Sequence, residues 1–150
     1  MSVTLRSARP DDEDFLFELF RQTVGDELAM LGDAMLRMQF KAQLLTYSAQ
    51  FPAAEHQIIM LDERAIGRVL VERTESENRG VDIALLPEYR NGGIGRMLVQ
   101  ELLDEAARAG KPFRISVVKS NPALHLYERL GFKTTGDTGT QFLMEWVAED

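Results

Sequence analysis

The 150-residue sequence contains no cysteine. This excludes a disulfide framework, a thiolate metal site and a cysteine acyl-enzyme. No apolar run reaches the roughly 18–20 residues that cross a bilayer, and the first six residues lack the apolar stretch of a signal peptide. We therefore expect a cytoplasmic protein with no membrane partner.

Basic residues are scarce, with 17 Lys and Arg against 24 Asp and Glu and a formal net charge of −7. A general nucleic-acid binder carries a basic face, so we expect no nucleic-acid partner. The acidic balance is compatible with a cationic partner, although solubility alone also explains it. No linker or internal repeat interrupts the chain, and its apolar content of 45% suffices for one core. Residues 1–150 are therefore predicted to form a single domain.

Hydrophobic periodicity predicts alternating strands and helices. Strands are expected at residues 3–9, 56–61, 65–72, 81–86, 113–118, 132–135 and 141–147. Helices are expected from Pro10, over 26–51 with a break at Gly32-Asp33, over 94–110 with Gly110 as its C-terminal cap, and over 122–130. The polar segment 74–80 is expected to be a loop, and Met30, Met35 and Met38 are expected to fill the core. Strands joined through helices pair in parallel and hairpins pair antiparallel, so the fold is predicted to be α/β, with a mixed sheet covered by helices on both faces.

The first segment with chemical potential follows the apolar strand at 81–86 and leads into a helix. It reads Arg90-Asn91-Gly92-Gly93-Ile94-Gly95-Arg96. Glycine lets the backbone approach a ligand, and the first N–H groups of a helix lack internal partners, so the segment can form an anion site. Arg90 and Arg96 could add charge-assisted bonds. An ordinary glycine-rich turn is the alternative. A P-loop is excluded because Gly95 is followed by Arg96-Met97, and a dinucleotide fingerprint because Leu98 replaces its third glycine.

The second segment runs from Asn121 to Phe132. Asn121 suits an N-cap and Pro122 a first helical position. Tyr127 shares one helical face with apolar neighbours and points toward the sheet. From this pattern alone, Tyr127 is read as a core aromatic residue.

Together the two segments resemble the signature of the GNAT acetyltransferase superfamily. Arg90 to Gly95 fits Arg/Gln-x-x-Gly-x-Gly/Ala, and about thirty residues later Asn121 to Phe132 resembles Asn-x-x-Ala-x-x-Leu-Tyr-x-x-x-Gly-Phe, with the Ala one place earlier. The second loop residue is often basic in this family but here it is Gly92, so one phosphate contact is in doubt, with Arg96 as its substitute. The resemblance spans about residues 60–147 and implies a GNAT-like, mostly antiparallel sheet of six to seven strands.

The resemblance also implies which residues bind the cosubstrate, acetyl-CoA. The loop Arg90, Asn91, Gly92, Gly93, Ile94 and Gly95, with Arg96, would hold the CoA pyrophosphate. The strand edge at 83–86, including Leu85 and Leu86, would pair with the pantetheine arm, and the strand at 113–118 would splay away from it. Asn121 would orient the pantetheine, and Tyr127 would act as the general acid that protonates the leaving thiolate. The resemblance implies no metal site and suggests a homodimer.

The sequence thus predicts an acetyl-CoA-dependent N-acetyltransferase that transfers the acetyl group directly to a primary amine of a small molecule or peptide. Two alternatives are a non-catalytic CoA-binding sensor or scaffold, and a phosphate-ligand protein that does not use CoA. Asp82 and Glu72 are candidate proton acceptors, although both also read as solvent-facing strand charges. His56 and His125 are expected at the surface.

The acceptor pocket is expected to lie in residues 11–55, as in relatives of this family. Four acids of this segment could attract an ammonium group, and two of its aromatic residues could flank the cleft. The acids are Glu18, Asp26, Glu27 and Asp33; the aromatic residues are Phe40 and Tyr47. A cationic or amine-bearing acceptor is therefore expected. The alternative is that these acids are solvated helix caps and that the pocket is mostly apolar.

Overall fold

A computed structural model describes residues 2–24 and 30–149 of the chain. The N-terminal half contains β1 (Val3–Ser7), a 3-10 turn (Pro10–Asp12), α1 (Glu13–Thr23), α3 (Asp33–Gln50), β2 (Glu55–Leu61), β3 (Arg64–Arg73) and β4 (Asn78–Leu85). The C-terminal half contains a 3-10 turn (Pro87–Tyr89), α4 (Ile94–Ala109), β5 (Phe113–Val118), α5 (Leu124–Arg129), β6 (Lys133–Asp137) and β7 (Gln141–Trp146). No helix in these residues is both long and apolar enough to cross a membrane.

The seven strands form one sheet in the order β1-β2-β3-β4-β5-β7-β6. Every neighbouring pair is antiparallel except β4–β5, which is parallel because α4 connects the two strands. The predicted mixed, mostly antiparallel α/β sheet is confirmed.

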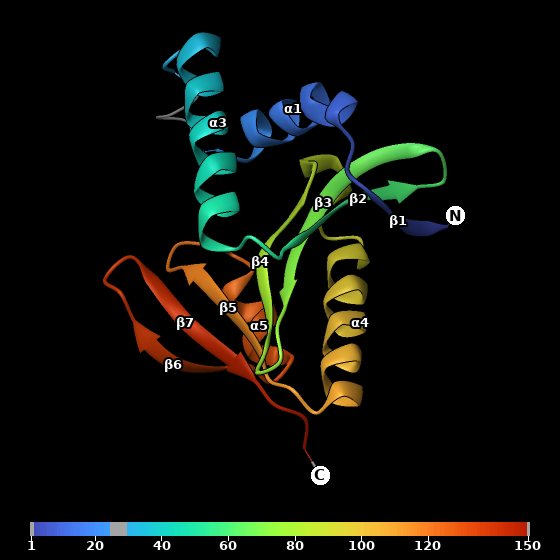
Figure 1. Cartoon of the computed structure of the whole chain (residues 1–150), viewed down its shortest axis with the longest axis vertical. Helices are drawn as coiled ribbons and strands as arrows, with labels where there is room; N and C mark the ends of the chain where they lie inside the picture. The colour runs from blue at the N-terminus through green and yellow to red at the C-terminus, as the bar shows by residue number, and fades with distance from the viewer. Residues whose placement is uncertain (1, 25–29, 150) are drawn as a thin grey trace.

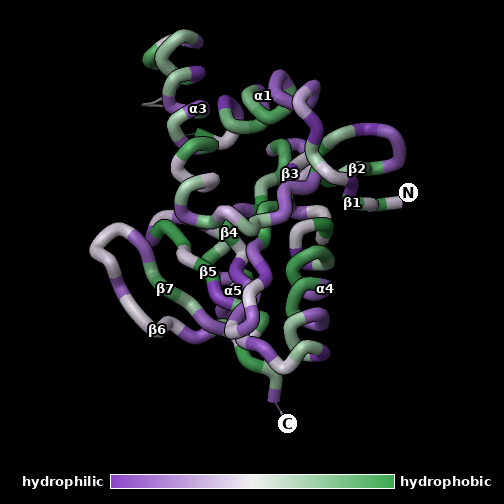
Figure 2. The backbone as a smooth tube through the Cα atoms, in the orientation of Figure 1, coloured by the Kyte–Doolittle hydropathy of each residue, from purple (hydrophilic) through white to green (hydrophobic). Residues whose placement is uncertain are grey.

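Helices cover both faces of the sheet (Figure 1). A larger core cluster lies on the α4 face and also receives residues of α5, whereas a smaller cluster joins α1 and α3 to the opposite face. Figure 2 shows that α3 mixes hydrophobic and hydrophilic residues along its length. The predicted cap is also confirmed, since Gly110 ends α4 in the left-handed conformation with φ of 68°.

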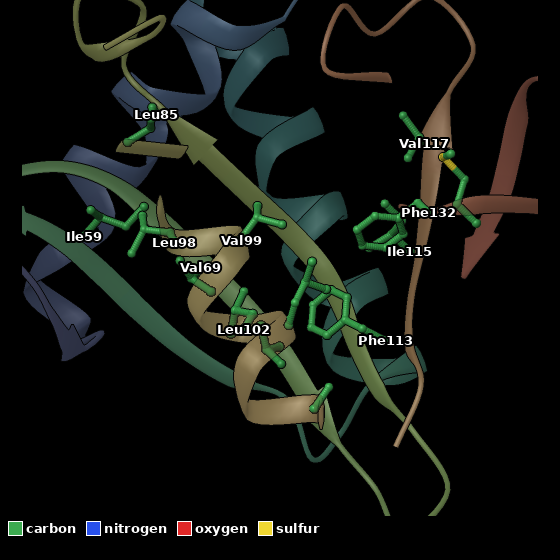
Figure 3. Close-up of a cluster of buried hydrophobic side chains, with 14 of the residues drawn as sticks. Ile59, Val69, Leu85, Leu98, Val99, Leu102, Phe113, Ile115, Val117 and Phe132 are labelled. Carbon is green, nitrogen blue, oxygen red and sulfur yellow. The ribbon is translucent and has the colours of Figure 1, made fainter. Parts of the chain in front are cut away.

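The centre of the sheet is split between β4 and β5. Their pairing starts at Asn78↔Phe113 and ends at Gly80↔Ile115. At that point β4 contains an extra residue, Val81, because Leu70 of β3 pairs with Asp82 while Val71 pairs with Gly80. A bulge of this kind bends its strand and increases its twist, so it turns the rest of β4 away from β5. Figure 3 shows the result: Phe113 lies beside β4, but Leu85 and Val117 lie on diverging strands.

Several local predictions were wrong. β4 begins at Asn78, inside the expected loop, because the Asn78 side chain is buried and donates to Glu105 of α4 at 3.3 Å. The last helix, α5, begins at Leu124 rather than 122.

The three methionines expected in the core are instead exposed. Met30, Met35 and Met38 expose 86%, 44% and 65% of their surface. α3 has two apolar stripes, and the one that contains Leu36 and Phe40 packs on the sheet. The part of the predicted helix at 26–29 lies outside the described residues.

Candidate active site

The gap between β4 and β5 leaves part of β4 with a free edge. The N–H of Leu86 donates to Ile66 O of β3 at 2.8 Å. Because the backbone groups of successive strand residues point in opposite directions, those of Ile83 and Leu85 face the gap. The edge can therefore accept an extended ligand as an added strand. The N–H of the predicted binding residue Leu86 is used within the sheet, so only Leu85 of that pair presents its backbone to the gap.

The free edge leads into the glycine-rich loop at the start of α4. In the described part of the chain, none of the N–H groups of residues 91–96 donates to a backbone carbonyl, and Met97 is the first to do so, to Gly93 O at 3.0 Å. Asn91 and Gly93 have positive φ angles of 63° and 88°. Such alternation of backbone conformation turns consecutive N–H groups toward one side and suits an anion.

Two of the loop glycines are not required by the fold. Gly93 needs its positive φ, but Gly92 and Gly95 have no such angle. A Cβ on Gly92 would meet nothing within 4 Å, and a Cβ on Gly95 would meet only Leu85 Cδ1 at 3.8 Å, an ordinary contact. The missing side chains therefore leave an open cradle over the N–H groups, and its shape and donors fit a pyrophosphate.

The two arginines of the loop are placed differently. Arg90 Nε donates to Leu85 O at 3.1 Å, so its side chain also fixes the end of β4. Arg96 is exposed in the first turn of α4. Arg90 directly precedes the residues with free N–H groups, and Arg96 is the last of them. Each guanidinium group has N–H donors left with which to bind an anion.

Tyr127 lies in α5 and packs edge-on against Phe132, with ring centroids 5.4 Å apart. Burial, and next the negative charge of Asp82, raise the pKa of Tyr127 above its usual value of 10. The phenol therefore keeps its proton at neutral pH. Tyr127 packs against the same core cluster as Ile83 of β4, so its packing in the core does not exclude a role beside the gap.

Asn121 does not cap α5 as predicted. Its Oδ1 accepts from Ala123 N at 2.9 Å, and its carbonyl accepts from Leu124 N at 3.1 Å, which forms a turn before the helix. The turn shortens α5 by two residues and leaves the Asn121 side chain exposed beyond the end of β5.

A polar cluster on the α3 face was missed from the sequence. Arg68 is only 4% exposed and binds Asp82 through Nε and Nη2, at 2.8 and 2.6 Å. Arg68 Nη2 also donates to Gln43 of α3 at 3.0 Å. Asp82 is therefore half of an ion pair rather than a solvent-facing strand charge. The one sign of this cluster in the sequence is Arg68 itself, a charged residue among the apolar residues of β3.

His56 belongs to the same cluster and is not at the surface as expected. Its Nε2 is buried without a hydrogen-bond partner in the described residues. Burial, and next the charge of Arg68, lower its pKa. His125 is exposed, as predicted. Glu72, the other candidate proton acceptor, makes only a long contact of 3.4 Å with Ala53 N.

Among the described residues expected to form the acceptor pocket, Glu18, Asp33, Phe40 and Tyr47 are not brought together at one site. Phe40 is fully buried and cannot flank a cleft. Glu18 is tied to Arg21 and Gln22 of its own helix, at 2.6 and 2.7 Å. Asp33 is exposed at the start of α3, and residues 26 and 27 lie outside the described residues. Tyr47 does line a hollow of about 230 Å³ between α3 and the sheet.

The sequence matches a known protein family over the region that contains this site. The model of an acetyltransferase (GNAT) domain matches residues 51–134. The chain belongs to the GNAT acetyltransferase family. The match covers the split strands, the glycine-rich loop and the Tyr127 segment.

Individual relatives agree with the family. The L-amino acid N-acyltransferase MnaT of Escherichia coli (strain K12) is 36% identical over 61 residues, which cover 37% of this chain and 36% of that protein. The crystal structure of the PaiA N-acetyltransferase from Thermoplasma acidophilum in complex with coenzyme A has a TM-score of 0.75 and 21% identity, and covers 99% of this chain and 100% of that one. The ribosomal-protein-S18-alanine N-acetyltransferase from Escherichia coli has a TM-score of 0.69 and 19% identity, over 97% and 94% of the two chains. These two structures share the fold.

Proposed function

We propose that this GNAT protein is an acetyl-CoA-dependent N-acetyltransferase that transfers the acetyl group directly to a primary amine of a small molecule or peptide. The proposal rests on three features that follow one another along the chain. These are the bulge at Val81, the free edge of Ile83–Leu85 and the open glycine cradle after β4. A ligand whose extended arm ends at a pyrophosphate, as the pantetheine arm of CoA does, fits all three at once. The coenzyme A complex of the PaiA enzyme, which has the same fold, supports this choice of ligand.

The residues of this chain have separate roles in the proposal. The N–H groups of residues 91–96, with Arg90 and Arg96, hold the pyrophosphate, and the backbone of Ile83 and Leu85 holds the pantetheine arm. Asn121 orients that arm from the opposite side of the gap. Acetyl-CoA would supply a thioester whose carbonyl carbon the neutral amine attacks. The ammonium form first passes a proton to Asp82 or to water, and the nitrogen loses its surplus proton by the same route as the amide forms. Tyr127 then donates its phenolic proton to the sulfur as the C–S bond breaks.

The gap also explains how the amine can reach the thioester. The cosubstrate would enter along the free edge, while α1 and α3 cover the other side of the sheet and leave the hollow beside Tyr47. Holding both reactants in one ternary complex makes the attack effectively intramolecular. The relatives that share sequence or fold act on different amines, an L-amino acid and a ribosomal-protein alanine by their names, and so leave the acceptor class open.

The decisive experiment measures CoA binding by calorimetry and acetyl transfer over a panel of amino acids, polyamines, aminoglycosides and peptides. We expect CoA to bind far more tightly than ADP and at least one amine to be acetylated. Tight CoA binding without turnover on any amine would favour the sensor or scaffold function instead. Equal affinity for ADP and CoA would contradict the assignment of the gap. A single domain, a cytoplasmic location and a homodimer stay predictions.

A further inference from the structure

The hollow between α3 and the sheet combines apolar walls with unused polar groups. It is lined by Leu44, Tyr47, Ser48, Phe51, Pro52, Ala54, His56, Arg68 and Leu70. Its volume of about 230 Å³ lies below the range of pockets for drug-sized ligands, which begins at roughly 300 Å³. The hollow therefore suits a small molecule with an apolar part.

The sheet register connects this hollow to the gap. His56 pairs with Leu70, and Leu70 pairs with Asp82, so the three side chains form one row on the α3 face. Neighbouring strands lie about 5 Å apart, so the row is roughly 10 Å long. Asp82 comes after the last residue of β4 that pairs with β5. A molecule lying on Leu70 thus has the gap at one end.

Three polar atoms around this row have no use within the described protein. The Arg68–Asp82 pair and the bond to Gln43 use Nε and Nη2 of Arg68 and Oδ2 of Asp82, which leaves Nη1 and Oδ1. The third atom is His56 Nε2, which alone of the three is fully buried without a partner in the described residues. Such a group is costly and requires an explanation. A bound ligand that pairs with it and with the two other free atoms supplies one.

We propose that this hollow binds the carboxylate of the acceptor on Arg68 and His56, and its ammonium on the free oxygen of Asp82. The acceptor is then a free α-amino acid with an apolar side chain. Its carboxylate faces Arg68 and its ammonium group faces Asp82. The proposal rests on the proposed function, because it places the amine of that acceptor beside the gap. Leu44, Phe51 and Leu70 contact the apolar side chain. A polyamine is disfavoured, because its second cation would face Arg68.

The kinetic test compares leucine with leucinamide and 3-methylbutylamine, which keep the amine and the apolar chain but lack the carboxylate. We expect kcat/KM to be about 10–100-fold higher for leucine, the scale of hydrogen bonds to a charged group. The His56→Gln variant should lose part of this preference, and Arg68→Lys, which keeps the charge but not the planar fork, should lose most of it. The exposed control His125→Gln should keep the full preference. Circular dichroism and CoA affinity report whether each variant is folded.

A second readout does not depend on turnover. The chain has only two histidines, so His125→Gln assigns both imidazole signals in a proton NMR spectrum. The charges that act on His56 are Arg68 from β3, Asp82 from β4 and Asp12 from the turn before α1, and Tyr47 of α3 shares its hollow. A carboxylate bound beside His56 favours the charged imidazole. Leucine should therefore raise the pKa of His56, with and without CoA, whereas 3-methylbutylamine should not.

The outcomes separate the two proposals. If amines are acetylated with no advantage for leucine and the His56 signal does not respond to it, the inference about the hollow is wrong and the acetyltransferase function stands. If CoA does not bind and no amine is acetylated, the proposed function is wrong. In that case a response of His56 to leucine still supports a carboxylate site in the hollow, and the lack of a response overturns it.

Discussion

The substitutions Gly95→Ala and Gly95→Glu together should separate cosubstrate binding from stability. Gly95 is the second residue of α4, and an added methyl group would meet only Leu85 Cδ1, at 3.8 Å. Alanine is favoured over glycine inside a helix by roughly 0.5–1 kcal/mol. We therefore expect the free energy of unfolding to stay the same or to rise by up to about 1 kcal/mol.

The same methyl group should leave CoA binding intact, because the signature that residues 90–95 resemble admits alanine at this position. Gly95→Glu, which brings a long side chain and a negative charge to the cradle, should weaken CoA binding by at least roughly 10–100-fold. This is the cost of losing one hydrogen bond to a charged group, about 1.5–3 kcal/mol.

Chemical denaturation and calorimetry with CoA measure the two effects. The matched control is Gly110→Ala at the other end of α4, where φ is 68° and no atom lies within 4 Å of the new Cβ. It should cost about 1–2 kcal/mol of stability because an L-residue is strained in this conformation, and it should leave CoA affinity unchanged. A folded Gly95→Glu protein with wild-type CoA affinity would refute the assignment of the cradle.

Three further predictions follow from side chains near the gap and in the first turn. Tyr127→Phe should lower kcat by about 10²–10⁴-fold in steady-state assays, with little change in CoA affinity, because it removes only the donated proton; an unchanged kcat would leave Tyr127 as a core residue. Arg90→Ala should weaken CoA binding by about 1–3 kcal/mol in calorimetry, and equal affinity would exclude a phosphate contact. Asp12→Asn should cost about 1–3 kcal/mol of stability at pH 7, because the hydrogen bonds from Arg6 hold the pKa of Asp12 at about 2, below its usual 3.8. This contribution is present above pH 4 and is lost as the pH falls toward 2, so denaturation curves of the two proteins should converge there.

The order of the elements could be predicted because each carries its own periodic pattern and end signals. Gly110 marked the end of α4, and the apolar strand before the loop marked β4. The gap beside β4 was expected from the family resemblance, but its cause was not. The extra residue Val81 appears only when two strands are aligned, and a single sequence does not show their register.

The errors share one physical origin, which is that periodicity does not say which side of an element is buried. α3 carries apolar residues on two stripes, and the sequence does not tell which of them packs on the sheet. Phe40 therefore looked available to a pocket while Met38 looked like core, and the structure reverses both. The sequence likewise does not show that His56 and Asp82 belong to one cluster. They belong together because Leu70 of β3 pairs with both residues and Arg68 lies beside them.

If the proposed cosubstrate binds at the gap that the Val81 bulge opens, the protein's resistance to unfolding depends on that cosubstrate. The free edge of β4 is an unpaired strand edge in the middle of the sheet, and such edges invite pairing with other chains. If the pantetheine arm fills this edge, CoA at 100 times its Kd adds about 2.7 kcal/mol to the free energy of unfolding. In a cell, the concentration of CoA would then set how much of the protein survives heating and how much aggregates.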